Sequence, residues 1–135
     1  MTARQYDLGD AELEALKVLW DYGALTVREV LTHLHEAGRR VAYTTVQTLL
    51  NRLEQKGYVK SDKSEFAYVY RARLTRERLT RSRLKALVKQ LYDGAAGPLV
   101  LQLIQNEQFT AKEIEELHEL IDHLDIVREA PEPEK

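Results

Sequence analysis

Apolar residues recur every three or four positions in two segments near the start of the chain, a spacing typical of amphipathic helices. In the first segment, Asp10 is expected to cap a helix that ends near Gly23. The apolar positions of this helix are Leu13, Leu16, Leu19 and Trp20. In the second segment, Thr26 and Glu29 form a capping-box pattern, in which each side chain satisfies a backbone amide at the helix start. The sequence therefore predicts two helices before Gly38.

A third helix is predicted over residues 43–56, where apolar side chains again form one stripe at helical spacing. The stripe consists of Val46, Leu49, Leu50 and Leu53. Gly57 suits the left-handed position that commonly follows a helix end. The stripe must face a core, so the opposite side of this helix is predicted to face solvent or a partner.

After Gly57 the period of the pattern changes from 3.6 to 2. This change predicts a strand over residues 58–61, a polar turn over 62–65 and a returning strand over 66–70. The aromatic residues expected to share one packed face of this hairpin are Phe66, Tyr68 and Tyr70. Three short helices followed by a two-stranded hairpin are typical of a winged helix-turn-helix domain.

Helical spacing returns in the second half of the chain. Thr75 is expected to cap a long helix that ends near Gly94, and Pro98 suits the first turn of a short helix over residues 99–105. A further capping box at Thr110 starts the last helix. The predicted fold class is therefore α+β, mostly α.

We divide the chain into a winged helix-turn-helix DNA-binding domain over 1–74, a helical dimerisation domain over 75–128 and a frayed tail over 129–135. The helices of the second domain have apolar faces and no sheet to cover them, and so short a segment buries little surface by itself. We therefore expect a two-fold dimer, although a monomer with these helices folded back on the first domain remains an alternative. The expected dimerisation residues are Leu87, Leu91, Leu99, Val100, Leu103, Ile104, Ile114, Leu117, Ile121 and Leu124.

Composition excludes several classes of protein. The chain has 135 residues, of which 44% are hydrophobic and 31% charged, and this suits one compact domain or a small domain with an oligomerising segment. It contains no cysteine, which removes disulfides, thiolate metal sites and cysteine nucleophiles. No stretch approaches the ~18 unbroken apolar residues of a membrane span, so we predict a cytoplasmic protein without membrane insertion.

Catalytic and metal-binding patterns are weak. His33 and His35 do not share a helix face, and His118 and His123 do not have the spacing of a metal-binding pair. No glycine-rich phosphate loop, nucleophile elbow or clustered carboxylate pair stands out. We predict that the protein is not an enzyme and has no cofactor or metal.

The net charge of −2 conceals a separation of charge along the chain. Residues 1–38 hold 3 basic and 7 acidic residues, residues 39–90 hold 14 and 4, and residues 91–135 hold 3 and 11. A basic middle between acidic ends favours an anionic partner, with double-stranded DNA as the first candidate. The alternative is a solvated helix surface, and charge by itself does not decide between them.

The polar face of the third helix favours DNA. It carries hydroxyl, amide and guanidinium groups, which can contact base edges and phosphates, and its one acidic residue, Glu54, lies at the far end. A merely solvated face would usually show more Glu and Lys in complementary pairs. The candidate DNA-binding residues, with those of the preceding connection and the hairpin, are Arg39, Arg40, Tyr43, Thr44, Thr45, Gln47, Thr48, Asn51, Arg52, Lys60 and Lys63.

Several blocks of the sequence resemble the BlaI/MecI penicillinase-repressor family. The most specific is AYTTVQTLLNRL at residues 42–53. The others are LGDAELE at 8–14, KVLW at 17–20, TVREV at 26–30, Gly57, YVY at 68–70, PLVL at 98–101 and IEEL at 114–117. The similarity covers nearly the whole chain from Leu8 to about Leu124.

The resemblance implies a homodimeric winged-helix repressor of palindromic operators with TACA/TGTA-like half-sites, controlling β-lactamase or related genes. In that family a membrane-bound sensor protease acts indirectly on the repressor, which is then cut at an Asn-Phe bond in the dimerisation helices. The corresponding pair here is Gln102-Leu103, which departs from the family pattern. The copper-responsive branch of the family binds metal through cysteines, which this chain lacks.

Our hypothesis from the sequence is a dimeric transcriptional repressor. Two alternatives remain. One is a winged-helix regulator that responds to a small ligand without proteolytic release. The other is a protein–protein adaptor that uses the winged helix as a scaffold, because a fold by itself does not define a function.

Overall fold

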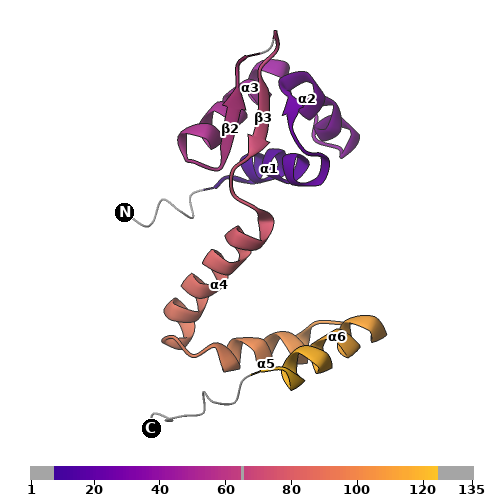
Figure 1. The fold of residues 1–135 in the computed structure, drawn as a ribbon, viewed down its shortest axis with the longest axis vertical. Helices are drawn as coiled ribbons and strands as arrows, with labels where there is room; N and C mark the ends of the chain where they lie inside the picture. Colours follow the sequence, from indigo (N-terminus) through magenta and orange to yellow (C-terminus); the bar gives the residue numbers. More distant parts are fainter. Residues whose placement is uncertain (1–7, 65, 125–135) are drawn as a thin grey trace.

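The computed structural model describes residues 8–64 and 66–124. The elements are α1 (Asp10–Tyr22), β1 (Leu25–Thr26), α2 (Val27–Glu36), α3 (Tyr43–Gln55), β2 (Val59–Asp62), β3 (Val69–Ala72), α4 (Arg76–Tyr92), α5 (Ala96–Asn106) and α6 (Ala111–Asp122). In Figure 1, α1, α2, α3 and the strands lie together at one end of the molecule, and α4 leads away from them to α5 and α6. The predicted class, a mostly helical α+β chain with a winged helix-turn-helix, is confirmed. The predicted tail, residues 129–135, lies outside the described residues.

Side-chain caps start three helices where the sequence predicts them. The Thr26 hydroxyl accepts a hydrogen bond from the Glu29 N–H at 3.2 Å, and the Glu29 carboxylate accepts one from the Thr26 N–H at 2.9 Å. Thr110 forms the same capping box at the start of α6, and Thr75 caps α4. Partners three residues apart in the chain fix these helix starts, so they need no tertiary contact.

The start of α1 differs from the prediction. Asp10 is the first residue of the helix, and Gly9 takes the capping position. The reason is that the carboxylate of Glu12, three residues beyond Gly9, accepts a hydrogen bond from the Gly9 N–H at 3.1 Å.

The three strands form an antiparallel sheet in the order β1-β3-β2. Strand β3 lies in the middle, with Tyr70 opposite Leu25 of β1 and opposite Ser61 of β2. The sequence analysis missed β1, because two residues are too few to show an alternating pattern. It also placed the returning strand over 66–70, whereas pairing with β1 and β2 sets it at Val69–Ala72.

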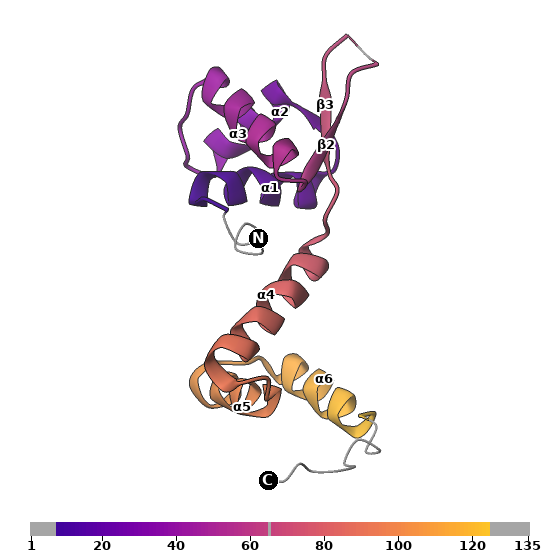
Figure 2. The ribbon, with the colours of Figure 1, turned by 90° about the vertical axis from the view of Figure 1, so that its left-hand side faces the viewer.

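The prediction that three hairpin aromatics share one packed face is therefore wrong for two of them. Tyr70 is buried, but Tyr68 is half exposed and Phe66 is fully exposed. Both lie before β3, in the connection from β2, where no facing layer covers them. Figure 2 shows this connection extending beyond the helices as the tip of the wing.

The core of the winged helix lies between α1, α2, α3 and the sheet. Leu16, Leu34, Leu50 and Leu53 are fully buried there, each contributing about 2 kcal/mol by removal from water. Leu79 of α4 is buried against this core. Trp20 is partly buried at its edge, where the indole N–H donates to the Leu74 carbonyl at 2.8 Å.

The helices of the second half of the chain are much more exposed than those of the winged helix. No residue of α5 or α6 is buried, although both helices carry apolar faces as predicted. Helix α5 begins at Ala96, earlier than predicted, with Pro98 in its first turn. No helix in the described part of the chain is long and apolar enough to cross a membrane. Apart from Leu79, the apolar side chains of α4, α5 and α6 are therefore only partly covered in a single chain.

Candidate nucleic-acid interface

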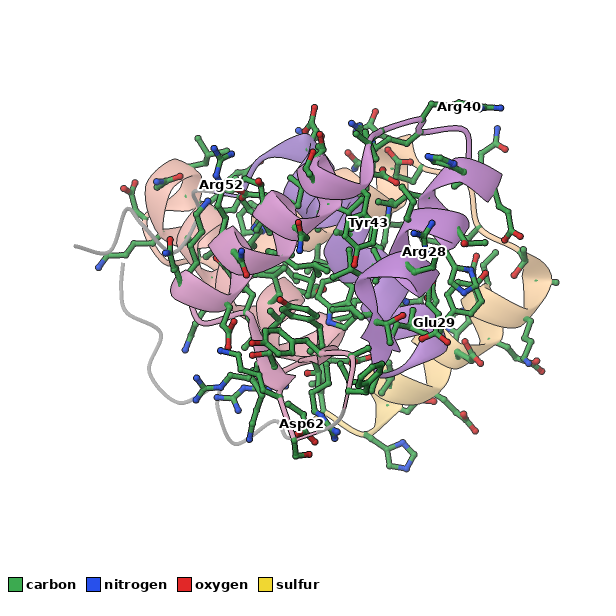
Figure 3. The ribbon with its side chains drawn as sticks, turned by 90° about the horizontal axis from the view of Figure 1, so that it is seen from above. Arg28, Glu29, Arg40, Tyr43, Arg52 and Asp62 are labelled. Carbon is green, nitrogen blue, oxygen red and sulfur yellow. The ribbon has the colours of Figure 1, made fainter. Side chains whose placement is uncertain are left out.

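Helix α3 has one face in the core and the other in solvent. Val46, Leu50 and Leu53 on the inner face are fully buried. The exposed residues of the helix include every candidate of the predicted reading face: Tyr43, Thr44, Thr45, Gln47, Thr48, Asn51 and Arg52. Figure 3 looks down on the end of the molecule that carries α2, α3 and the wing, and it labels Tyr43 and Arg52 there. The structure thus brings the predicted reading residues together on one exposed surface.

The remaining basic candidates surround this helix. Arg40 is exposed in the connection between α2 and α3, whereas Arg39 beside it is half-buried. Lys60 is exposed on β2, and Lys63 follows the same strand with its ammonium 5.3 Å from the centre of the Tyr68 ring. Positive charge thus lies both before the start of α3 and on the wing, and basic side chains in such positions can contact DNA phosphates.

The turn after β2 is shaped by Asp62, labelled in Figure 3. Its carboxylate accepts hydrogen bonds from the Ser64 hydroxyl at 2.7 Å and the Ser64 N–H at 3.0 Å. These bonds, with the charges of Arg71 and Lys60, hold the pKa of Asp62 below its usual range. Asp62 is therefore ionised and committed to the turn, and it partly offsets the positive charge of the wing.

A buried tyrosine is hydrogen-bonded to one of the predicted DNA-binding side chains. The Tyr70 hydroxyl donates to the side-chain carbonyl of Asn51 at 3.3 Å. Burial, and after it the nearby charge of Glu54, raises the pKa of Tyr70, so its hydroxyl keeps its proton. Because the carbonyl of Asn51 already accepts this bond, its NH₂ group remains to donate to a base. Thymine O4, guanine O6 and purine N7 are acceptors of that kind in the major groove.

The C-terminal end of α3 is fastened at two points. The ammonium of Lys56, just after the helix, lies 2.7 Å from the buried carboxylate of Glu12 in α1. The Glu54 carboxylate accepts from the Ser61 hydroxyl at 2.8 Å and from the Ser61 N–H at 3.2 Å. Glu54, the one acidic residue of α3, is therefore directed to β2. These contacts fix the angle at which α3 leaves the core.

Sequence reasoning missed Arg28 as a candidate. This residue follows the first position of α2, and its guanidinium carbon lies 5.1 Å from the centre of the Tyr43 ring. Figure 3 shows the two side chains next to each other on the end that carries α3. The TVREV block placed Arg28 on a helix, but no signal in the sequence showed that this helix position meets the start of the next one.

The junction between the two halves uses other basic residues. Arg76, at the start of α4, lies 3.0 Å from the carboxylate of Asp21 and 5.1 Å from the Trp20 ring centre. Together with the Trp20–Leu74 hydrogen bond, these contacts join α1 to the beginning of α4. The charge of Arg76 is thus engaged within the chain.

The histidines have ordinary partners. His33 stacks on Tyr22 with ring centres 3.8 Å apart, and a ring nitrogen of His35 lies 2.9 Å from the Val41 carbonyl. Within residues 8–64 and 66–124, no cluster of three or more His, Asp or Glu side chains is arranged to hold a metal ion.

A winged helix that exposes amide, hydroxyl and guanidinium groups on its third helix, amid basic residues, has the features of a DNA-binding regulator of transcription. The sequence signature of the penicillinase repressor family matches residues 8–123, so the chain belongs to that family. The resemblance found in the sequence blocks is confirmed. The protein is therefore a DNA-binding transcriptional repressor, and not an enzyme.

The chain aligns with individual members of the family over most of their length. The chain is 27% identical to a penicillinase repressor of Staphylococcus aureus over 124 residues, which cover 92% of this chain and 98% of the relative. It is 28% identical to a penicillinase repressor of Bacillus licheniformis over 115 residues, covering 85% and 89%. The solved complex of hsRosR-S4 is similar in fold, with a TM-score of 0.52 and 18% identity over 85% of this chain and 96% of that one.

Proposed function

We propose that the protein acts as a homodimer that represses transcription by occupying an inverted-repeat operator. The observation that carries the proposal is the exposure of the apolar faces of α5 and α6, neither of which has a buried residue. A single chain that left these faces largely in water would gain little hydrophobic stabilisation to offset the entropy cost of ordering the two helices.

A second copy is the partner that fits these faces. The exposed fractions of Leu91, Leu103 and Ile121 are 64%, 46% and 56%. These side chains are already about half covered within one chain, so covering the remainder of each contributes about 1 kcal/mol, and a two-fold interface counts each residue twice. The predicted dimerisation residues that are exposed in one chain are Leu87, Leu91, Val100, Leu103, Ile104, Ile114, Ile121 and Leu124, and Leu99 and Leu117 are half exposed.

Two-fold symmetry sets the form of the DNA site. Each subunit presents one copy of α3, so two recognition helices enter two major grooves, and the half-sites lie about one helical turn, or a multiple of it, apart. The proposed base contacts come from Thr44, Gln47, Thr48 and Asn51. Phosphate neutralisation by the basic residues of the connection and the wing supplies much of the affinity, which therefore falls with rising salt.

The regulated genes are proposed from the relatives. Proteins named penicillinase repressor and methicillin resistance regulatory protein MecI align over 85–92% of this chain. We propose β-lactamase or related resistance genes as targets, with operators of the TACA/TGTA type. A membrane-bound sensor protease is the proposed upstream partner.

The proposed cleavage pair lies within a regular helix. Gln102 and Leu103 are in the middle of α5, and the Asn106 side-chain NH₂ donates to both the backbone and side-chain carbonyls of Gln102 at 2.9 Å. Cutting between them requires this turn to unfold locally, so we expect cleavage to be slow in the folded dimer.

Selection of bound fragments from genomic DNA, combined with sedimentation, tests the proposal. We expect a dimer at micromolar concentration and enrichment of an inverted repeat. A duplex with one half-site scrambled should bind far more weakly than the intact repeat. Sedimentation as a single subunit, or equal binding to every duplex, contradicts the proposal.

A further inference from the structure

We propose that Arg28 of α2 binds a phosphate of the operator and that Tyr43 of α3 is the positioning residue that holds it in place. The inference rests on the proposed function, because it assigns a further contact to the same interface. It adds a residue from the first helix of the turn, outside the helix that reads the bases.

The guanidinium of Arg28 lies over the ring of Tyr43. Arg28 and Tyr43 come from different helices, and the guanidinium carbon lies 5.1 Å from the centre of the ring, within the range of a cation–π interaction. Arg28 is exposed, and Tyr43 is 39% exposed. Figure 3 shows both on the end of the molecule that carries α3, so the pair borders the surface proposed to meet DNA.

The acidic neighbour of Arg28 in the sequence does not pair with it. The neighbouring carboxylate, Glu29, accepts from the Thr26 N–H at 2.9 Å as part of the capping box. Across the residues that the structure describes, the guanidinium of Arg28 enters no hydrogen bond or ion pair. Its five N–H donors, arranged as a planar fork, therefore remain for an external group, and a phosphate matches that fork with two parallel bonds.

The contact with Tyr43 also holds the Arg28 side chain in place before DNA binds. A free arginine side chain carries about 2 kcal/mol of rotamer entropy, part of which is lost on binding. Stacking on Tyr43 restricts the chain in advance and leaves the edges of the guanidinium open. In helix-turn-helix proteins the first helix of the turn crosses the DNA backbone while the second lies in the groove. Arg28 belongs to that first helix, so the group that it meets is a phosphate rather than a base.

The rival explanation is that the pair only joins α2 to α3. The salt dependence of binding separates the two, because a purely structural contact does not change the number of phosphates neutralised. The logarithm of the binding constant falls as the logarithm of the salt concentration rises. Each lost phosphate contact makes this slope less steep by about 0.9. A dimer makes the contact once in each half-site, so the slope falls by about 2.

The experiment uses the full chain and a duplex recovered by genomic selection, with fluorescence anisotropy at several salt concentrations. We expect Arg28→Ala to lower affinity about tenfold, to lower the salt slope by about 2, and to weaken binding to a scrambled duplex by the same factor. Arg28→Lys should keep the slope and lose part of the affinity, since the charge stays and the fork is lost. Arg81→Ala, which removes an exposed arginine of α4, is the control and should leave the slope unchanged.

The positioning role of Tyr43 is tested by comparing its substitution with and without Arg28. Tyr43→Leu should weaken binding in the wild-type background and have a smaller effect in the Arg28→Ala background, because its action passes through the arginine. Tyr43→Phe retains the ring that holds the guanidinium and should therefore keep most of the wild-type affinity. The fluorescence of Trp20, the sole tryptophan of the sequence, verifies that each variant is folded.

Several outcomes overturn the inference. If the wild type binds the repeat and Arg28→Ala binds it with unchanged affinity and slope, Arg28 makes no DNA contact. A loss restricted to the selected duplex contradicts the assignment to a phosphate. A wild-type chain that binds no duplex refutes the proposed function, and the inference with it.

Discussion

Replacing Glu12 by glutamine removes a charge that joins the C-terminal end of α3 to α1. The Glu12 carboxylate lies 2.7 Å from the Lys56 ammonium and accepts the Gly9 N–H at 3.1 Å. The side chain of Glu12 is only 7% exposed, whereas that of Lys56 is 26% exposed. The pair is thus buried on one side and reaches water on the other.

The expected loss follows from these two contacts. A hydrogen bond to a charged group contributes about 1.5–3 kcal/mol, and truncating a cap costs about 1 kcal/mol. Glutamine keeps an oxygen for the Gly9 N–H, and Lys56 can turn toward water, which limits the penalty. We therefore expect Glu12→Gln to lower the free energy of unfolding by about 1.5 kcal/mol. Glu12→Ala, which also removes the acceptor, should lower it by about 2.5 kcal/mol.

Urea unfolding at fixed protein concentration, followed by Trp20 fluorescence, measures this loss. Trp20 lies in α1 and so reports on the winged helix. The matched control is Glu14→Gln in the same helix, whose carboxylate forms no hydrogen bond or ion pair among the described residues. Equal stability of Glu12→Gln and the control would refute the reasoning.

The same pair predicts a pH dependence. Burial by itself raises the pKa of Glu12, but the hydrogen bonds from Lys56 and Gly9 and the charges of Lys56 and Arg52 outweigh it and hold the pKa below its usual 4.5. A carboxyl whose pKa is lower in the folded state adds stability above its unfolded pKa and loses it as the pH falls through the folded pKa. The difference in the free energy of unfolding between the wild type and Glu12→Gln should therefore be largest near neutral pH and should shrink below pH 4.5.

Three further predictions concern DNA binding and assembly. Arg52→Ala should weaken operator binding by about 1–3 kcal/mol in anisotropy titrations, and unchanged affinity would remove Arg52 from the interface. Leu103→Asp should convert the dimer to single subunits in sedimentation and reduce binding to the level of an isolated half-site, whereas a dimer that persists would place the interface elsewhere. Tyr70→Phe should release the Asn51 carbonyl, so that discrimination among single-base operator variants relaxes at one position by about 0.5–1.5 kcal/mol. Unaltered discrimination would show that Tyr70 does not orient Asn51.

Much of the candidate interface was predictable because helix periodicity is a local property. Four buried residues between Tyr43 and Gln55 place the inner face of α3, and the geometry of the helix then puts Thr44, Gln47 and Asn51 on the opposite side. What these side chains do next was not predictable. The hydrogen bond between Tyr70 and Asn51 joins residues 19 positions apart, and it directs the side-chain carbonyl of Asn51 toward β3.

The wing shows where local reasoning failed. An alternating pattern over 66–70 suggested a strand, but pairing with β1, more than 40 residues earlier, places the strand at Val69–Ala72. A two-residue strand has no detectable period, so the sequence could not show the partner that sets the register. Phe66 and Tyr68 were consequently expected in a packed layer, and they lie in the exposed connection.

The sequence by itself determined the helices and, for α2, α4 and α6, the capping residues that start them. Contacts between residues three or four positions apart, such as those of Thr26 with Glu29, form in any surroundings. Only the tertiary structure decided which distant groups meet: Glu12 with Lys56, and Arg28 with Tyr43. The physical reason is that such contacts depend on how the helices cross, which is set by the packing of the whole core rather than by any one segment.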